Sequence, residues 1–215
     1  MEVYKMNNFK DIINVNRNAY NQLASEFNSR ESYLANYKQN LKVYISRFVK
    51  ESENVLEIGP GTGHLLQILE NLGCRTTAIE LSEKMCGLVR KNSPKTVILN
   101  QDIFTVNFCA QQFDVICALA LIHTIPAREA KDFMKKVKYW LKDDGIFIFD
   151  TVIYDESKEV FIDSGEHKNV KKFRKQYTQI ELEELICSSG FKIEDLSLNY
   201  QESNSKIWMR YACKK

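Results

Sequence analysis

The sequence predicts an α/β fold with a mostly parallel sheet, in a single domain that covers residues 1–215. From residue 54 onward, short apolar runs alternate with amphipathic segments of helical period, which is the pattern of βαβ units. A turn with three glycines separates the first apolar run from the first helical segment. A chain of this length buries about 70% of its unfolded surface, which is enough for one large core.

Residues 1–51 are expected to form helices that precede the sheet and cap it. Apolar side chains recur at helical spacing in two stripes, one within residues 20–27 and the other within residues 34–48. Two N-terminal helices are the simplest structure with this pattern.

Residues 52–152 are expected to form the central core, with short connections between its elements. The predicted strands cover residues 55–58, 76–79, 96–99, 113–118 and 145–151. The predicted helices cover residues 64–72, 83–91 and 128–141. The first of these helices carries an apolar stripe that we expect to face the sheet.

Residues 153–177 fit neither the helical nor the strand period. Their charged, irregular composition predicts an excursion over the carboxyl edge of the sheet, where loops usually shape a binding site on the substrate side. This segment contains a basic run that forms either a solvated loop face or a site for an anionic substrate. The run consists of Lys168, Lys171, Lys172, Arg174 and Lys175.

Residues 178–215 are expected to form a helix followed by a hairpin. Thr178 and Glu181 make a capping box ahead of an apolar stripe, and Gly190 ends the helix. Two apolar runs within residues 191–213 flank a polar turn. They predict two closing strands and an antiparallel end to the sheet.

Charge and cysteine content limit the classes of function. Thirty basic and 28 acidic residues leave a formal charge of +2, too small to indicate a nucleic-acid or membrane partner. The six cysteines form no C-x-x-C pair, which favours a reducing, cytoplasmic location. The N-terminus lacks an apolar signal segment, and no run approaches the ~18 apolar residues of a membrane span. No Cys/His cluster has the spacing of a metal site.

The turn that contains Gly59, Gly61 and Gly63 is the strongest local signal, because glycines let a ligand approach the backbone closely. Its spacing is G-x-G-x-G. A dinucleotide fingerprint needs glycine where His64 stands, so an NAD-dependent oxidoreductase is the weaker alternative. No Lys-Ser or Lys-Thr pair follows the turn, so the sequence does not indicate a phosphate loop for nucleotide hydrolysis.

Two acidic residues follow later strands at positions that suit an adenosine. Glu80 ends the second predicted strand, 80 − 61 = 19 residues after Gly61, where its carboxylate can accept hydrogen bonds from a ribose diol. Asp102 follows the third strand and can accept from an exocyclic amine, while Ile103 covers the base. Together with the glycine turn, these residues predict an adenosine pocket.

Four ordered segments resemble the motifs of the class I S-adenosylmethionine-dependent methyltransferase family. VLEIGPGTGHL is similar to the first motif, AIELSEKM to the second, QDIF to the third and FDVICALALIHTIP to the fourth. KQYTQIELEELICSSGF is similar to the segment before the last two strands. The resemblance implies a Rossmann-like three-layer sandwich, with a mostly parallel seven-stranded sheet and an antiparallel last strand. It also implies S-adenosylmethionine as cofactor and S-adenosylhomocysteine as product.

By matching position, the resemblance also assigns residues to the parts of the cofactor. It places Glu57, Gly59, Gly61 and Gly63 at the methionine part, Glu80 at the ribose, Leu81, Met85, Asp102 and Ile103 at the adenine, and Leu119 at the sulfonium. The stretch 18–27 is similar to the Y-D-x-x-A-x-x-Y helix of small-molecule members, although Asn21 replaces the aspartate. Tyr20 is therefore expected to cover the cofactor.

Methyl transfer from a sulfonium depends mainly on alignment and desolvation. A hydroxyl or ammonium acceptor must still lose a proton, and His123 is either the base or a structural histidine. The fourth motif reads ALAL, without the N-P-P-Y-like tetrapeptide of enzymes that methylate nucleic-acid bases. The resemblance thus favours a small organic acceptor, methylated at nitrogen or oxygen. A non-catalytic module that only binds S-adenosylmethionine is the alternative.

Overall fold

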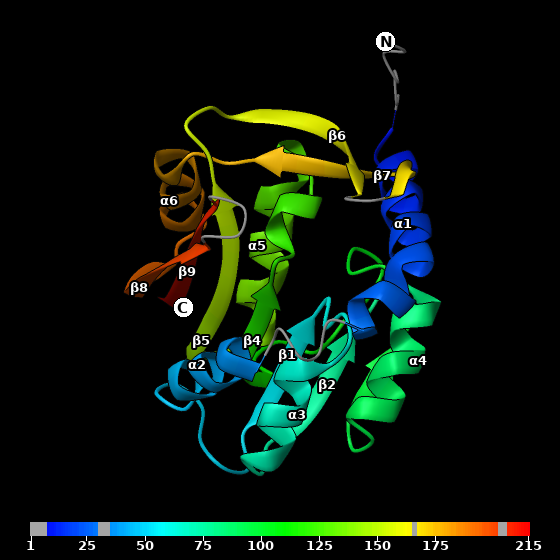
Figure 1. Ribbon diagram of the computed structural model, residues 1–215. Helices are drawn as coiled ribbons and strands as arrows, with labels where there is room; N and C mark the ends of the chain where they lie inside the picture. Colours follow the sequence, from blue (N-terminus) through cyan, green and yellow to red (C-terminus); the bar gives the residue numbers. More distant parts are fainter. Residues whose placement is uncertain (1–7, 30–34, 165–166, 202–205) are drawn as a thin grey trace.

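The fold is built on a seven-stranded sheet whose strands follow the order β3-β2-β1-β4-β5-β9-β8. The computed structural model describes residues 8–29, 35–164, 167–201 and 206–215 (Figure 1). The strands are β1 Asn54–Ile58, β2 Arg75–Ile79, β3 Val97–Leu99, β4 Phe113–Leu119, β5 Leu141–Ile153, β8 Lys192–Gln201 and β9 Lys206–Lys214. Strand β9 runs antiparallel to both of its neighbours, whereas β1 to β5 pair in parallel. The predicted α/β sheet with an antiparallel last strand is confirmed.

Helices cover both faces of this sheet and make it a three-layer sandwich. They are α1 Phe9–Ser29, α2 Ala35–Ile45, α3 His64–Asn71, α4 Glu83–Asn92, the 3-10 turn η2 Ile122–Thr124, α5 Ala127–Trp140 and α6 Gln179–Ser188. Side chains of α2, α3 and α4 form one buried cluster with the sheet, and side chains of α5 and α6 form another on the opposite face. Because successive strand residues point to opposite faces, Val55 belongs to the first cluster and Leu56 to the second.

The segment predicted as an irregular excursion contains a β-hairpin, which corrects that expectation. Its strands, β6 Lys158–Ser164 and β7 His167–Gln176, form a separate antiparallel sheet. Figure 1 shows this hairpin crossing above the carboxyl ends of the parallel strands, with α1 beside it. The strand period is hard to recognise in the sequence because a lysine occupies a buried position. Lys175 is only 3% exposed, and its ammonium pairs with Glu181 at 2.7 Å.

The C-terminal elements follow the predicted order of a helix and two closing strands. Thr178 caps α6, since its Oγ1 accepts a 3.2 Å hydrogen bond from the backbone N–H of Glu181. Strands β8 and β9 then pair antiparallel, and β9 inserts beside β5. Within the described residues, no helix is long and apolar enough to cross a membrane.

Candidate functional site

The glycine turn between β1 and α3 adopts a backbone that favours glycine. Gly59, Gly61 and Gly63 have φ angles of +69°, +56° and +87°, a region that L side chains rarely enter. A Cβ on Gly59 would lie 2.8 Å from Leu121 Cδ1, whereas a Cβ on Gly61 would meet no atom within 4 Å. A side chain at Gly59 would therefore have to displace Leu121, while Gly61 borders open space that a ligand can fill.

Glu57, in β1, places a buried carboxylate beneath this turn. Its side chain is 3% exposed and accepts a hydrogen bond from the backbone N–H of Leu66 in the first turn of α3. The other oxygen, Oε2, has no hydrogen-bond partner among the described residues. Burial, followed by the charges of Glu80 and Asp150, raises the Glu57 pKa to about 8. A buried acceptor without a partner is costly, so this oxygen suits a ligand that donates a hydrogen bond or carries positive charge.

Glu80 stands at the end of β2, where the fold brings its carboxylate to the glycine turn. Its Oε1 accepts a 2.7 Å hydrogen bond from the backbone N–H of Ser82, and the backbone N–H of Gly61 also donates to this carboxylate. Burial nevertheless raises the Glu80 pKa to about 7. Leu81 is half-buried, and Met85 is 1% exposed on the inner side of α4.

The loop after β3 carries Asp102 and Ile103 to the other side of this region. Asp102 Oδ1 accepts a 3.0 Å hydrogen bond from the backbone N–H of Phe104. The Lys136 ammonium, from α5, donates to the carbonyl oxygens of Ile103, Phe104 and Val106 at 3.2, 3.1 and 2.6 Å. Asp102 also lines an open cavity of about 490 Å³ between this loop and α1. Lys136 thus fixes the path of the loop that borders the cavity.

Helix α1 is hydrogen-bonded to two separate elements around the site, η2 and β7. Asn16 donates to the carbonyl oxygen of Thr124 at 3.2 Å and accepts from the backbone N–H of Phe173 in β7 at 3.0 Å. Tyr20 accepts from the Arg174 guanidinium at 3.0 Å. The Asn16 contacts span 108 and 157 residues of sequence, so no local pattern marks this residue in the sequence.

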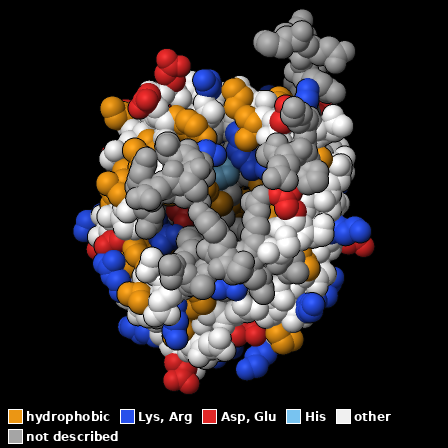
Figure 2. Space-filling view, in the orientation of Figure 1, with side chains coloured by type: hydrophobic (Ala, Val, Ile, Leu, Met, Phe, Trp, Pro, Cys, Tyr) orange, Lys and Arg blue, Asp and Glu red, His pale blue; other side chains and the backbone are white. Residues whose placement is uncertain are grey.

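His123 lies in η2 and is 7% exposed. Its Nδ1 is 2.9 Å from Thr151 Oγ1, and its ring meets the Trp208 ring edge-on at 6.1 Å between centroids. Burial lowers the His123 pKa well below its usual range, and the charges of Arg174, Lys172 and Lys206 lower it further. The imidazole is therefore neutral at pH 7. On the face drawn in Figure 2, a histidine and several basic side chains lie around a central hollow.

A buried ion pair supports the end of β4 between these two regions. Asp150 in β5 accepts from Arg210 in β9 at 2.8 Å, and both are at most 5% exposed. The same carboxylate accepts a 2.8 Å hydrogen bond from the backbone N–H of Ala120, which has a φ of +53°. Leu119, directly before this residue, is half-buried. Asp150 thus holds the chain in a left-handed conformation where β4 ends, a role that no motif in the sequence indicates.

Comparison with known proteins links this arrangement to one enzyme family. A family model described as a methyltransferase domain matches residues 56–149. An uncharacterized methyltransferase of Oceanobacillus iheyensis, OB1106, is 25% identical over 173 residues, which cover 77% of this chain and 79% of that protein. A ribosomal protein L11 methyltransferase of Acetivibrio thermocellus is 27% identical over 122 residues, which cover 55% of this chain and 37% of that protein.

Solved structures of low sequence identity share the fold. A structure of a DhpI–SAH complex aligns with a TM-score of 0.76 at 19% identity, covering 96% of this chain and 98% of that chain. The 1,6-didemethyltoxoflavin-N1-methyltransferase of Burkholderia thailandensis, solved with 1,6-didemethyltoxoflavin and S-adenosylhomocysteine, aligns with a TM-score of 0.65 at 18% identity. That alignment covers 90% of this chain and 87% of that chain.

Proposed function

This chain belongs to the class I, Rossmann-like family of S-adenosylmethionine-dependent methyltransferases, and from that premise we propose that it methylates a nitrogen or oxygen of a small organic acceptor. S-adenosylmethionine is the cofactor and S-adenosylhomocysteine the product. The cofactor supplies a methyl group that its sulfonium already activates, so the protein has to align the reactants and exclude water. Membership of this family argues against the NAD-dependent oxidoreductase, and methyl transfer to an acceptor distinguishes the enzyme from a module that only binds S-adenosylmethionine.

The observation that carries the cofactor assignment is the buried Glu57 oxygen without a partner among the described residues, together with the open space over Gly61 in the turn that follows β1. The ammonium of the methionine part would supply the missing donor to Glu57. Glu80 would accept hydrogen bonds from the ribose hydroxyls, and Asp102 would accept from the adenine amine, with Leu81, Met85 and Ile103 around the base. Leu119 would border the sulfonium, and Tyr20 would cover the cofactor from α1.

An acceptor of small size is favoured by the elements that cover this end of the sheet. Helix α1 and the β6–β7 hairpin lie over it, and hydrogen bonds through Asn16 and Tyr20 join the two into one cover. His123 would accept the proton of a hydroxyl or ammonium acceptor, since its imidazole is neutral. A cytoplasmic location also belongs to the proposal, and the six unpaired thiols favour it.

Calorimetry with S-adenosylmethionine, S-adenosylhomocysteine and NAD tests the cofactor site. We expect both sulfur nucleotides to bind, and Glu80→Ala to weaken binding at least ten-fold, because each hydrogen bond to a charged group contributes ~1.5 to 3 kcal/mol. Glu83→Ala, at an exposed position of α4, is the matched control. Absence of binding, or equal affinities of the two variants, would refute the cofactor assignment.

A labelled methyl group tests the acceptor class. Protein with methyl-labelled S-adenosylmethionine is incubated with a cell extract that is then separated into small metabolites, proteins and nucleic acids. We expect label in the small-metabolite fraction only, and loss of this label with Glu80→Ala. Label in the protein or RNA fraction would replace the small acceptor by a macromolecule and leave the methyltransferase activity standing.

A further inference from the structure

Resting on the proposed function, we infer that the acceptor carries an anionic carboxylate or phosphoryl group, and that Arg174 binds this group beside His123 with the help of Lys172 and Lys206. In this proposal, the part of the site that binds the acceptor contains a pocket for its anionic group. Arg174 and Lys172 belong to β7, and Lys206 begins β9.

The alternation of β7 directs these cations to the inside of the hairpin. Arg174 donates to the Tyr20 hydroxyl of α1, so in the regularly paired part of the strand, residues 171–176, the even-numbered side faces that helix. Lys172 and Arg174 share this side and are half-buried. Strand β7 also contacts η2, which carries His123. The cationic side of β7 therefore faces the acceptor region.

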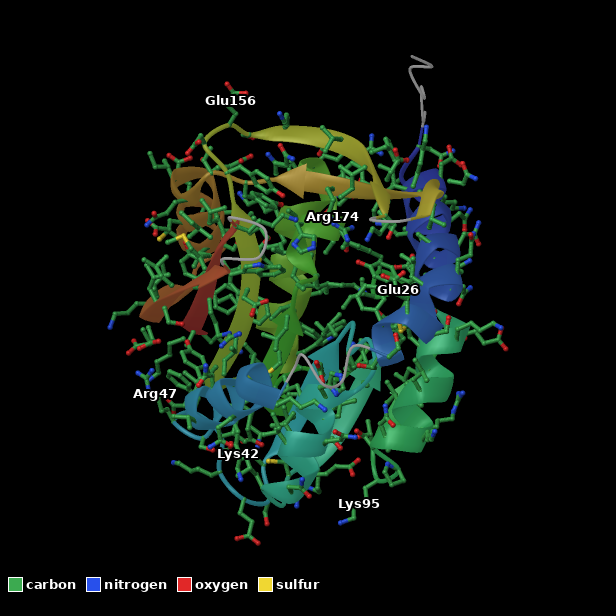
Figure 3. The ribbon with its side chains drawn as sticks, viewed as in Figure 1. Glu26, Lys42, Arg47, Lys95, Glu156 and Arg174 are labelled. Atoms are coloured by element: carbon green, nitrogen blue, oxygen red, sulfur yellow. The ribbon has the colours of Figure 1, made fainter. Side chains whose placement is uncertain are left out.

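Arg174 has hydrogen-bond partners but no ion-pair partner in the described part of the chain. Its guanidinium donates to the carbonyl oxygen of Phe173 at 2.8 Å and to the Tyr20 hydroxyl at 3.0 Å, and both acceptors are neutral. Figure 3 shows Arg174 below β7, on the side of the central space. A half-buried guanidinium is usually paired with an anion, and its rigid fork offers five donors. The donors that remain suit a bidentate carboxylate or phosphoryl group.

Two acids on the strands β6 and β5 that flank this region are already occupied by other donors. Glu159 of β6 accepts from the backbone N–H of Ala127 at 2.7 Å. Asp150 accepts from Arg210 and from the backbone of Ala120. The charges that act most strongly on His123 are all positive, which gives this side of the site a basic character.

The two halves of the site thus differ in charge. The cofactor half holds the carboxylates of Glu57 and Glu80, which suit a cationic sulfonium and ammonium. The acceptor half holds Arg174 and its neighbouring lysines. This difference in charge orients both reactants. The basic half repels the cationic cofactor, and the acidic half repels an anionic acceptor.

The chemistry balances with such an acceptor. A lone pair of the acceptor nitrogen or oxygen forms the new bond to the methyl carbon, while the carbon–sulfur bond breaks and its electron pair stays on sulfur. A proton on the acceptor atom passes to neutral His123. The bound anion offsets the nearby cations and so makes the protonated imidazole easier to form.

The test follows the His123 ring by NMR in protein saturated with S-adenosylhomocysteine, with inorganic phosphate and acetate as separate probes. We expect one or both probes to raise the His123 pKa, whereas chloride at equal ionic strength does not. The response to phosphate against acetate distinguishes a phosphoryl from a carboxylate site. The spectrum of His123→Gln assigns the signal.

Arg174→Met should abolish this response and keep S-adenosylhomocysteine affinity within about two-fold, while Arg174→Lys should retain part of it. Lys158→Met, exposed on the same hairpin, is the charge-matched control and should behave as the parent protein. A His123 signal in the parent protein that responds to neither probe would overturn the anion pocket, as would an unchanged response in Arg174→Met. Failure to bind S-adenosylhomocysteine at all would instead contradict the proposed function.

Discussion

The side-chain oxygen of Asn21 in α1 accepts a 2.6 Å hydrogen bond from the Ser82 hydroxyl at the start of α4. The backbone N–H of Ser82 in turn donates to Glu80 Oε1 at 2.7 Å. This chain of contacts couples the position of α1 to the carboxylate that we assign to the ribose. Asn21 therefore replaces the aspartate of the family pattern with a side chain that still accepts hydrogen bonds.

Asn21→Ala should loosen α1 and weaken S-adenosylhomocysteine binding several-fold. Asn21 also accepts from the backbone N–H of Lys84, so we expect a loss of about 1–2 kcal/mol in the free energy of unfolding. Asn21→Asp should retain binding, because a carboxylate accepts the same bonds and is favourable at a helix N-terminus. Calorimetry and denaturant unfolding measure both effects, with Asn18→Ala, exposed on α1, as control. Unchanged binding by Asn21→Ala would contradict the coupling.

The raised pKa of Glu57 predicts that cofactor binding releases protons. In the free protein this carboxyl, with a pKa of about 8, is mostly protonated at pH 6 to 7. A cationic cofactor favours the carboxylate, so affinity should rise with pH by up to about ten-fold per unit below the pKa. Calorimetry in two buffers of different ionisation enthalpy counts the released protons. Glu57→Gln should remove most of the dependence and leave the smaller part that Glu80 contributes. A proton count of zero in the parent protein would refute this account.

The lowered pKa of His123 predicts a loss of stability in mild acid. The unfolded chain binds a proton at its histidine near pH ~6.5, while the folded protein resists protonation of His123. The unfolded state therefore gains protons first as pH falls, and stability falls with it. Relative to His123→Gln, the parent protein should lose up to about 1.4 kcal/mol per pH unit between pH 6.5 and the folded pKa. Denaturant unfolding of both proteins at pH 7.5 and pH 5 measures the difference, and equal pH slopes would exclude a neutral buried imidazole.

Lys136→Met should destabilise the loop after β3. The substitution keeps the aliphatic stem but leaves three carbonyl oxygens without their donor, and we expect a cost of about 1–3 kcal/mol. Hydrogen exchange should rise in residues 102–106, and affinity for S-adenosylhomocysteine should fall. Lys135→Met, which removes an exposed ion pair with Asp132, should have little effect. Equal exchange in the two variants would show that Lys136 does not hold the loop.

Several features of the fold can be predicted from short stretches of the sequence. Alternating apolar runs and helical stripes predict the strands and helices of the main sheet, because burial on one face imposes a period on neighbouring residues. The glycine spacing predicts the turn after β1, since only glycine enters its backbone conformation without strain. The N-terminal cap of α6 can also be predicted locally, because Thr178 and its partner Glu181 are only three residues apart. The cofactor contacts assigned to individual residues remain predictions.

Contacts between residues far apart in the chain depend on how the helices and strands pack in three dimensions. The sheet order places β9 beside β5, and only this order pairs Arg210 with Asp150. The hairpin that carries Arg174 reads as irregular in sequence, because its buried Lys175 is neutralised by Glu181 of a later helix. Side-chain partners of this kind depend on which helices and strands lie next to each other in the fold. The periodicity of neighbouring residues contains no information about that arrangement.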